Sequence, residues 1–298
     1  MKDLKIGVLG AGTMGHGIAQ VSAMAGHSVT IRDIEENLVD EGIDAIEENL
    51  QGGVERDKVS GDEKAATLSR ISGTTDLAAA VADADLVVEA VPEDVDLKKQ
   101  TFEDVEQAAP EDAVIASNTS SLPVTEIVSA LDDPGRGIGL HFFNPVHIMQ
   151  LVEIVVGEQT DDETVEFVTE FVENVGKTAI EVQDTAGFAS SRLGVALGVE
   201  AMRMVEEGVA SPRDIDQSME LGYNHPMGPV ELGDVVGLDV RLDILEHLRE
   251  ELGERFRPPQ ILRRKVRAGK LGKKTGEGFY VWEDGEIAGT SGDWGDDR

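Results

Sequence analysis

From Leu4 to Val182, short apolar runs alternate with segments whose apolar residues recur at helical spacing. Apolar runs of about 4–8 residues between turn residues are typical of strands covered on both faces. The predicted strands are 4–9, a segment ending at Asp33, 71–74, 85–91, 113–116, 138–141, 151–156 and 178–182. The predicted helices between them are one after Gly15 that includes Ile18, Val21 and Met24, then 35–50, 77–81, 98–108, one after the polar turn at 117–122, and 163–175, with a loop or helix break at 52–61. This alternation predicts an α/β fold with a Rossmann-type, doubly wound and mainly parallel sheet.

Beyond Asp184 the pattern becomes helical almost throughout. Helical spacing continues over 188–207, 212–221, 228–252 and 258–268, with glycine or proline at each break. We therefore predict a nucleotide-binding domain over residues 1–184 and an all-helical domain over 185–283. The last segment, 284–298, is acidic and glycine-rich, and we predict a disordered tail there.

Composition narrows the class of protein. Hydrophobic residues make up 40% of the 298, which is typical of a globular chain. No run of about 18 apolar residues and no signal-peptide pattern is present, so we expect a cytoplasmic protein without a membrane span. The absence of cysteine excludes disulfides and thiolate chemistry. The six histidines lack metal-binding spacing, and we expect no metal site.

The net charge of −33 is unusual for a chain of this size. Asp and Glu number 59 against 26 basic residues, of which 11 are lysine. Such a surface repels nucleic acid and anionic membranes, so neither is expected as a partner. Acidic residues spread along the whole chain favour a protein from a salt-loving organism, where salt screens the self-repulsion. The alternative is an acidic protein adapted to ordinary salt.

The first strand leads into a glycine-rich turn with the spacing Gly10, Gly12 and Gly15. Gly10 permits a tight turn, Gly12 lets the backbone approach a pyrophosphate, and Gly15 allows close helix–strand packing. The N-terminus of the following helix would present free N–H groups and a positive dipole end to the phosphates. Asp33, about 20 residues on, can accept the ribose hydroxyls and repel a 2′-phosphate, which predicts NAD. The alternative is a glycine-rich turn that binds nothing.

Polar residues follow three of the predicted strands, where ligands of open α/β sheets bind. These clusters are Glu93 with Lys98, residues 117–121, and residues 141–144. Oxidation of an alcohol with hydride transfer requires a base, and histidine titrates near neutrality. A chain reversal after His141 would bring Glu153 beside the imidazole, where it could fix the tautomer. The alternative for His141 is a strand-end histidine bonded to backbone groups.

Four further segments carry a more specific pattern. They are 117–122 (SNTSSL), 139–145 (GLHFFNP), 151–154 (LVEI) and 272–280 (GKKTGEGFY). Together with the glycine turn, and in order from about residue 4 to 282, the chain resembles the 3-hydroxyacyl-CoA dehydrogenase family. The resemblance implies NAD-linked oxidation of an acyl-CoA substrate, (S)-3-hydroxyacyl-CoA of short chain such as 3-hydroxybutyryl-CoA, to 3-oxoacyl-CoA. It also implies a homodimer formed through the helical domain.

The resemblance assigns roles to individual residues. His141 is implied as the general base, Glu153 as its partner, and Ser120 as a group that binds substrate and faces the cofactor. The implied cofactor-binding set is Gly10, Gly12, Thr13, Met14, Gly15, Asp33, Glu93, Lys98, Ser120, Asn144 and Lys274. The implied substrate-binding set is Ser120, Asn144, Ser191, Asn49 and Arg56. Alternatively, Glu93 and Lys98 form only a solvated helix start, and Lys274 only a basic helix end.

One position departs from the family pattern. The family places Asn in the pattern G-F-x-x-N-R, where this chain has Ser191. The shorter hydroxyl leaves the reaction class intact and bears on acyl specificity. Separately, residues 263–274 hold seven of the 26 basic residues, either as a landing site for phosphates or as an ordinary solvated helix face.

Two rival functions follow from the same residues. A dehydrogenase of a free hydroxy acid would need an Arg or Lys for the carboxylate, and none lies in the polar clusters at 117–121 and 141–144. A catalytically idle NAD-binding protein would not need Ser120, His141, Asn144 and Glu153 together. An acyl-CoA dehydrogenase accounts for all four.

Overall fold

The computed structural model describes residues 3–292 of the chain. Two compact units divide the chain, Met1–Phe188 and Ala189–Arg298. The division falls close to the boundary predicted after residue 184. Among residues 3–292, no helix is both long and apolar enough to cross a bilayer.

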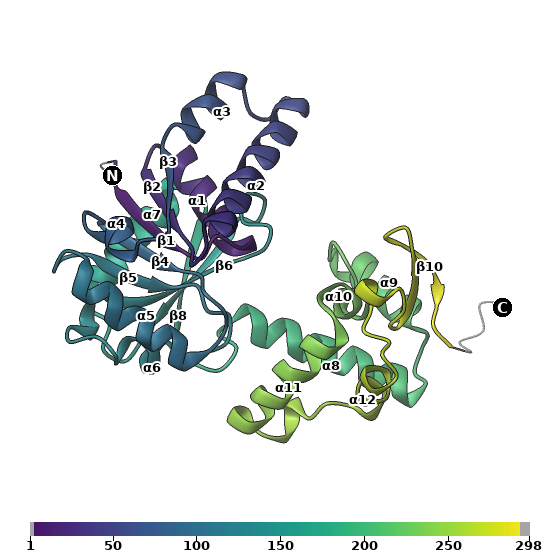
Figure 1. The fold of residues 1–298 in the computed structure, drawn as a ribbon. Coiled ribbons are helices and arrows are strands. Elements are labelled where there is room, and N and C mark those ends of the chain that lie inside the picture. Colours follow the sequence, from purple (N-terminus) through teal and green to yellow (C-terminus); the bar gives the residue numbers. More distant parts are fainter. Residues whose placement is uncertain (1–2, 293–298) are drawn as a thin grey trace. The chain divides into compact units, whose positions relative to one another are not determined.

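The first unit is built on an eight-stranded sheet with the order β3-β2-β1-β4-β5-β6-β7-β8 (Figure 1). The strands are β1 (Lys5–Leu9), β2 (Ser28–Arg32), β3 (Ile71–Thr74), β4 (Leu86–Glu89), β5 (Val114–Ser117), β6 (Gly137–Phe142), β7 (Leu151–Val156) and β8 (Thr178–Gln183). Neighbouring strands run parallel except β6 and β7, which are antiparallel. The predicted mainly parallel sheet is confirmed, with a strand at each predicted position.

Helices cover both faces of this sheet. They are α1 (Thr13–Met24), α2 (Glu36–Glu55), α3 (Gly61–Leu68), α4 (Leu77–Val81), α5 (Val95–Ala108), α6 (Val124–Val128) and α7 (Asp162–Asn174), with a 3₁₀ turn at Pro134–Arg136. Side chains alternate across a strand, so Leu86 and Val88 of β4 join the core under α1, α2 and α7. Val87 joins the opposite core under α4, α5 and α6. This two-sided covering is the doubly wound arrangement.

The predicted loop at 52–61 is shorter than expected. Helix α2 continues through Gly52 and Gly53 to Glu55, and α3 begins at Gly61. Ser60 caps α3, since its hydroxyl accepts the Glu63 N–H while the Glu63 carboxylate accepts the Ser60 N–H. This capping box sets the start of the helix.

Five helices form most of the described part of the second unit, residues 189–292. They are α8 (Ser190–Glu207), α9 (Pro212–Tyr223), α10 (Pro229–Val236), α11 (Leu238–Leu252) and α12 (Gln260–Arg267), with 3₁₀ turns at Glu254–Phe256 and Lys273–Thr275. The predicted single helix over 228–252 is wrong, because it is broken at Gly237. There φ is 105°, a left-handed value that interrupts the helix and favours glycine. The predicted helical second domain is otherwise confirmed.

The second unit also contains a hairpin that the sequence analysis missed. Strands β9 (Tyr280–Glu283) and β10 (Glu286–Thr290) pair antiparallel around Asp284 and Gly285, both with positive φ. Asp-Gly is a strong signal for a two-residue hairpin turn. The prediction of a disordered tail from residue 284 is therefore wrong for 286–290, and residues 293–298 lie outside the described part of the chain.

Candidate active site

The glycine-rich turn joins the carboxyl end of β1 to α1. Gly10 has φ of 100°, and a Cβ there would lie 2.5 Å from the Ala90 carbonyl oxygen. A Cβ on Gly15 would lie 1.7 Å from the Gly10 carbonyl oxygen. These two glycines are therefore required by the protein's own packing.

Gly12 differs from its two neighbours in the motif. A Cβ on Gly12 would meet no protein atom within 4 Å, and both Gly12 and Thr13 are exposed. Gly12 also serves as the N-cap of α1 without any side-chain cap, so the first N–H groups of the helix face outward. An open backbone beside helix N–H groups fits a pyrophosphate. The turn therefore fits the dinucleotide that the motif predicts.

Asp33 follows β2 and braces the same turn. One carboxylate oxygen accepts the Ala11 N–H at 2.7 Å and the other accepts the Ile34 N–H at 2.7 Å. The side chain remains half-exposed at the carboxyl edge of the sheet. The neighbouring Arg32 points its Nε to the Thr75 carbonyl. Asp33 is thus held at the position where a ribose acid is expected.

A fully buried ion pair lies at the end of β4. Lys98 Nζ is 2.7 Å from Glu89 Oε1 and 3.4 Å from Glu93 Oε2. Lys98 is 1% exposed, so its ammonium is enclosed between two carboxylates rather than presented to solvent. The alternative in which Glu93 and Lys98 form only a solvated helix start is therefore wrong for Lys98, although Glu93 is 38% exposed.

Glu93 organises the loop that follows β5. Its Oε1 accepts the Thr119 hydroxyl at 2.6 Å and the Ser120 N–H at 3.0 Å, and the Ser120 hydroxyl lies at 3.4 Å. Burial alone would raise the pKa of Glu93, but the Thr119 hydroxyl, the Lys98 ammonium and the Ser120 amide together hold that pKa below its usual value. The carboxylate therefore remains charged beside the exposed Ser120.

His141 and Glu153 face each other across the one antiparallel pairing of the sheet. They are direct register partners on β6 and β7, so their side chains project from the same face. His141 Nδ1 lies 2.8 Å from Glu153 Oε2, and Glu153 is fully buried. The predicted chain reversal and the predicted proximity of these two side chains are both confirmed. The alternative in which His141 bonds only backbone groups is wrong.

The surroundings of His141 are apolar. Its ring lies 4.4 Å from that of Phe143 and 5.8 Å from that of Phe188, between ring centroids. The Phe142 N–H donates to Asn118 Oδ1 at 2.9 Å, which ties the end of β6 to the loop carrying Ser120. Asn144 lies in the exposed turn after β6, ahead of a cis bond to Pro145. His141, near the end of β6, and Ser120, in the loop after β5, therefore lie at the same ends of two neighbouring strands.

The remaining predicted site residues lie away from this edge or in the second unit. Asn49 is half-buried on α2, and the exposed Arg56 follows that helix. In the second unit, Ser191 is half-buried in the first turn of α8. Lys274 lies 2.6 Å from Asp239 Oδ1, and Lys274 is 46% exposed.

The basic cluster at 263–274 is mostly paired within the second unit. Four members form ion pairs with carboxylates: Arg263 with Glu246, Arg264 with Glu206, Lys270 with Glu277, and Lys274 with Asp239. Lys265 instead donates to the Gly278 carbonyl, and Lys273 lies over the Trp282 ring. These pairings weaken the case for a phosphate landing site. In the described residues no group of three acidic or histidine side chains is placed to hold a metal.

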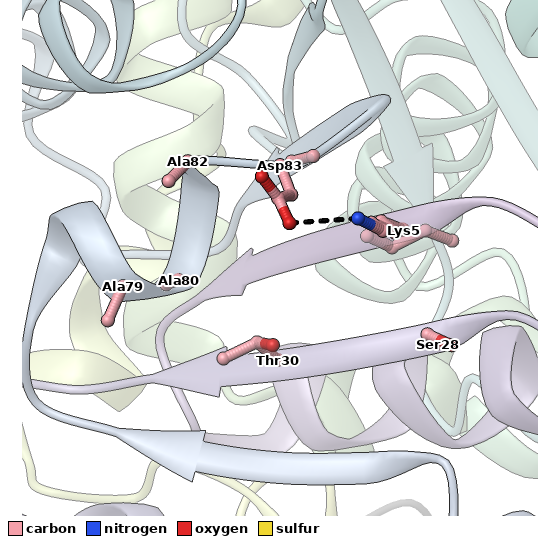
Figure 2. Close-up of a pocket in the computed structure, with 9 residues that line it drawn as sticks. Lys5, Ser28, Thr30, Ala79, Ala80, Ala82 and Asp83 are labelled. Carbon is pink, nitrogen blue, oxygen red and sulfur yellow. Dashed lines mark hydrogen bonds and ion pairs between the residues drawn. The ribbon is translucent and has the colours of Figure 1, made fainter.

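A separate hollow of about 300 Å³ lies beside the Lys5–Asp83 ion pair (Figure 2). It is lined by small residues of α4 and by β1 and β2, including Ser28 and Thr30. Lys5 begins β1, whereas the glycine-rich turn follows the other end of that strand. The hollow is therefore remote from the carboxyl edge where the candidate residues gather.

Known protein families match nearly the whole chain. Residues 5–185 match the 3-hydroxyacyl-CoA dehydrogenase NAD binding domain, and residues 187–282 match the C-terminal domain of 3-hydroxyacyl-CoA dehydrogenase. The chain belongs to the 3-hydroxyacyl-CoA dehydrogenase family. It is accordingly an NAD-dependent oxidoreductase, and NAD is its cofactor.

Individual relatives agree with this membership. A probable 3-hydroxybutyryl-CoA dehydrogenase of Deinococcus radiodurans is 46% identical over 280 residues, covering 94% of this chain and all of the relative. The mitochondrial hydroxyacyl-coenzyme A dehydrogenase of Sus scrofa is 42% identical, covering 93% of this chain and 90% of its own length. The crystal structure of (S)-3-hydroxybutyryl-CoA dehydrogenase from Ralstonia eutropha superposes with a TM-score of 0.91 at 39% identity, covering 94% of this chain and 100% of that structure.

Sequence reasoning missed two residues that shape the site. Glu89 was included in the predicted apolar strand without a role, although a lone acid inside an apolar run is a signal of a buried partner. Asn118 was part of a polar cluster, but its bond to Phe142 depends on which strands are neighbours. The structure supplies both contacts.

Proposed function

We propose that this protein oxidises short-chain (S)-3-hydroxyacyl-CoA, such as 3-hydroxybutyryl-CoA, to the 3-oxoacyl-CoA with His141 as general base. The observation that carries the proposal is the buried pair of His141 and Glu153 at 2.8 Å. Its placement at the carboxyl edge, on the sheet that carries the nucleotide turn, supports the same reading. The names of the relatives point to the four-carbon substrate.

The pair can handle the proton of the substrate hydroxyl. When Nδ1–H of His141 donates to the Glu153 carboxylate, the lone pair of Nε2 is the basic site. Nε2 then takes the proton from the C3 hydroxyl, and the buried carboxylate stabilises the imidazolium. NAD, when bound, accepts the hydride from C3. In the reverse direction His141 returns the proton to the alkoxide oxygen.

Ser120 and Asn144 would orient the reacting groups. The Ser120 amide is held by Glu93 at 3.0 Å, whereas the exposed hydroxyl makes only a long bond of 3.4 Å to the same oxygen and could exchange it for the substrate oxygen. Asn144 lies three residues after His141 and would contact the nicotinamide side. Ser191 and the pair Asn49 and Arg56 are proposed to contact the acyl-CoA.

The cofactor side of the proposal rests on the turn after β1. Gly10, Gly12, Thr13, Met14 and Gly15 would hold the pyrophosphate. Asp33 would accept the ribose hydroxyls while it keeps its bond to the Ala11 N–H. Beyond the turn, the proposed cofactor contacts are Glu93, Lys98 and Lys274. Because Lys98 is buried against Glu89, its contribution would be electrostatic rather than a direct contact.

A spectrophotometric assay of NADH consumption tests the proposal. The substrates are acetoacetyl-CoA and longer 3-oxoacyl-CoAs, with free acetoacetate as the competitor class. We expect turnover of the short thioester and none of the free acid. His141→Gln should lose about 10²–10⁴-fold in rate with NADH binding retained, which is the usual worth of general acid–base catalysis. His27→Gln is the matched control, since His27 is also buried but accepts the Leu4 N–H at the opposite end of β1 from the glycine-rich turn, and it should keep full activity. Full activity of His141→Gln would show that His141 is not the general base and would refute the proposed mechanism.

We also propose a homodimer formed through the second unit and a cytoplasmic location. Several large apolar side chains of its helices and their connections are exposed in the single chain: Leu193, Val209, Leu221, Tyr223, Val235 and Val240. Exposed apolar surface of this kind is typical of subunit interfaces. Sedimentation in high salt should give the mass of two chains, and Leu221→Asp should shift it toward one. A monomeric wild-type protein at micromolar concentration would contradict the dimer.

A further inference from the structure

Glu89 has no part in the proton and hydride chemistry, yet it is fully buried and both of its carboxylate oxygens accept hydrogen bonds. It is the last residue of β4, between β1 and β5 at the carboxyl edge of the sheet. Its Oε1 accepts the Val91 N–H and Lys98 Nζ–H, each at 2.7 Å. Its Oε2 accepts the Ser117 hydroxyl at 2.7 Å. Burying a carboxylate carries a large desolvation penalty unless it is paired in this way, so the presence of Glu89 at this position requires an explanation.

The contacts of Lys98 supply the next link. Its ammonium also donates to the Val91 carbonyl and lies 3.4 Å from Glu93 Oε2. Lys98 therefore holds two carboxylates, one buried and one at the surface. Glu89 takes the shorter contact, which leaves Glu93 as a weakly held partner of the same ammonium.

The other oxygen of Glu93 points to the loop of Ser120. Oε1 receives the Thr119 hydroxyl, the Ser120 N–H and, at 3.3 Å, the Ser121 hydroxyl. Glu93 can serve these donors because only its Oε2 is engaged by Lys98. Two carboxylates sharing one ammonium thus leave a surface carboxylate free to organise the loop.

We infer that Glu89 is a positioning residue of the reaction, acting on Ser120 through Lys98 and Glu93. The inference rests on the proposed role of Ser120 at the substrate. Without the charge of Glu89, Lys98 would pair with Glu93 alone and draw that carboxylate toward the interior. The amide and hydroxyls of residues 119–121 would then lose their acceptor, and the Ser120 hydroxyl would lose its fixed position.

Glu89→Gln tests the inference, because it keeps the shape and removes the charge. We expect kcat/KM for acetoacetyl-CoA to fall about tenfold, the upper range for one hydrogen bond. The decisive comparison is with Ser120→Ala. If Glu89 acts through Ser120, Glu89→Gln should change kcat/KM less than about twofold in the Ser120→Ala background, since coupled sites are not additive. If the effect of Glu89→Gln is purely structural, the double variant should instead show the product of the two single losses in kcat/KM, and this result would overturn the inference.

Glu106 provides the matched control. Its carboxylate pairs with Arg136 at 2.8 Å, also largely buried in the first unit, but Arg136 precedes β6 at the end of the strand opposite His141. Glu106→Gln should lower the melting temperature and leave kcat/KM unchanged. A loss of kcat/KM in Glu106→Gln as large as that in Glu89→Gln would show that any lost buried ion pair slows the enzyme, which would also overturn the inference.

A milder variant covers the case in which Glu89→Gln does not fold. Ser117→Ala keeps all three charges and removes the hydroxyl that donates to Glu89 and accepts the Thr119 N–H at 3.3 Å. It should give a smaller loss that again disappears in the Ser120→Ala background. Additive losses in that pair would overturn the inference. A wild-type enzyme inactive toward every acyl-CoA would refute the proposed function itself, which is a separate result.

Discussion

Replacing Glu153 with glutamine keeps the size of the side chain and removes the charge that faces His141. The Glu153 carboxylate is fully buried and lies 2.8 Å from Nδ1 of His141, on the neighbouring strand. During oxidation the imidazole becomes an imidazolium at that distance. A glutamine amide can still take the hydrogen bond, but it offers no opposite charge to the cation.

The loss can be estimated from this geometry. Two unit charges 2.8 Å apart attract by about 6 kcal/mol at an effective dielectric constant of about 20. Desolvation of both groups offsets much of this, and a charge-assisted hydrogen bond contributes about 1.5–3 kcal/mol net. At 1.36 kcal/mol for each factor of ten, kcat of Glu153→Gln should fall by about 10- to 160-fold. The loss should not exceed that of His141→Gln, about 10²–10⁴-fold.

Steady-state rates in both directions, with NADH binding measured separately by fluorescence, check this estimate. The equilibrium constant of the reaction does not depend on the enzyme, so kcat/KM should fall by the same overall factor in oxidation and in reduction. NADH affinity should not change. Adding Glu153→Gln to His141→Gln should lower kcat little further, because the effects of residues that act as a unit are not additive. A full further loss in the double variant, or a single variant within about twofold of wild type, would refute the assigned role.

Four other outcomes are expected from the structure and the charge. Gly12→Ala should weaken NADH binding without lowering the melting temperature, whereas Gly15→Ala should lower the melting temperature. Of these two glycines, only Gly15 lacks room for a Cβ. NAD should exceed NADP in kcat/KM, and Asp33→Ser should narrow the gap; equal use of both by the wild type would show that the ribose acid is misplaced. Ser191→Asn should change KM or kcat for acyl-CoA by an amount equal to one hydrogen bond, about 0.5–1.5 kcal/mol, with NADH affinity unchanged. With a net charge of −33, the melting temperature should rise between about 0.1 and 2 M KCl, over which the Debye length falls from about 10 Å to below 3 Å; an unchanged value would contradict salt adaptation.

The sheet and the histidine–glutamate pair could be predicted from sequence because both depend on local patterns. Apolar runs mark the eight strands, and the alternation of side chains along β6 and β7 places His141 and Glu153 on one face once the chain reverses. The reversal itself is signalled by the turn residues Asn144 and Pro145. These features need no knowledge of distant contacts.

Other features depend on tertiary contacts or on weak local signals. The bond of Glu89 to Ser117 requires that β4 and β5 be neighbours in a particular register, and its bond to Lys98 depends on how α5 packs against the end of β4; no segment of sequence specifies either. The break at Gly237 lies inside a continuous amphipathic pattern, so the glycine alone did not outweigh the helical spacing. The hairpin at Asp284 and Gly285 did carry a local signal, but acidic composition obscured it.

The pairing of β6 with β7 makes the spacing of the acid–base pair independent of the sequence of the turn that joins the two strands. Ladder hydrogen bonds fix the distance between His141 and Glu153. The turn over 143–150 is held separately, by the buried side chain of Val146 and by the bonds of Lys177 Nζ to the Val146 and Met149 carbonyls. Exchanges at exposed positions of that turn, such as Ile148 and Gln150, can therefore alter its surface while the acid–base pair keeps its spacing. A slip of one residue in the ladder would be different, because it would send the two side chains to opposite faces and abolish the pair. Recombination among relatives should thus be tolerated when crossovers fall within the turn, and rejected when they shift the strands.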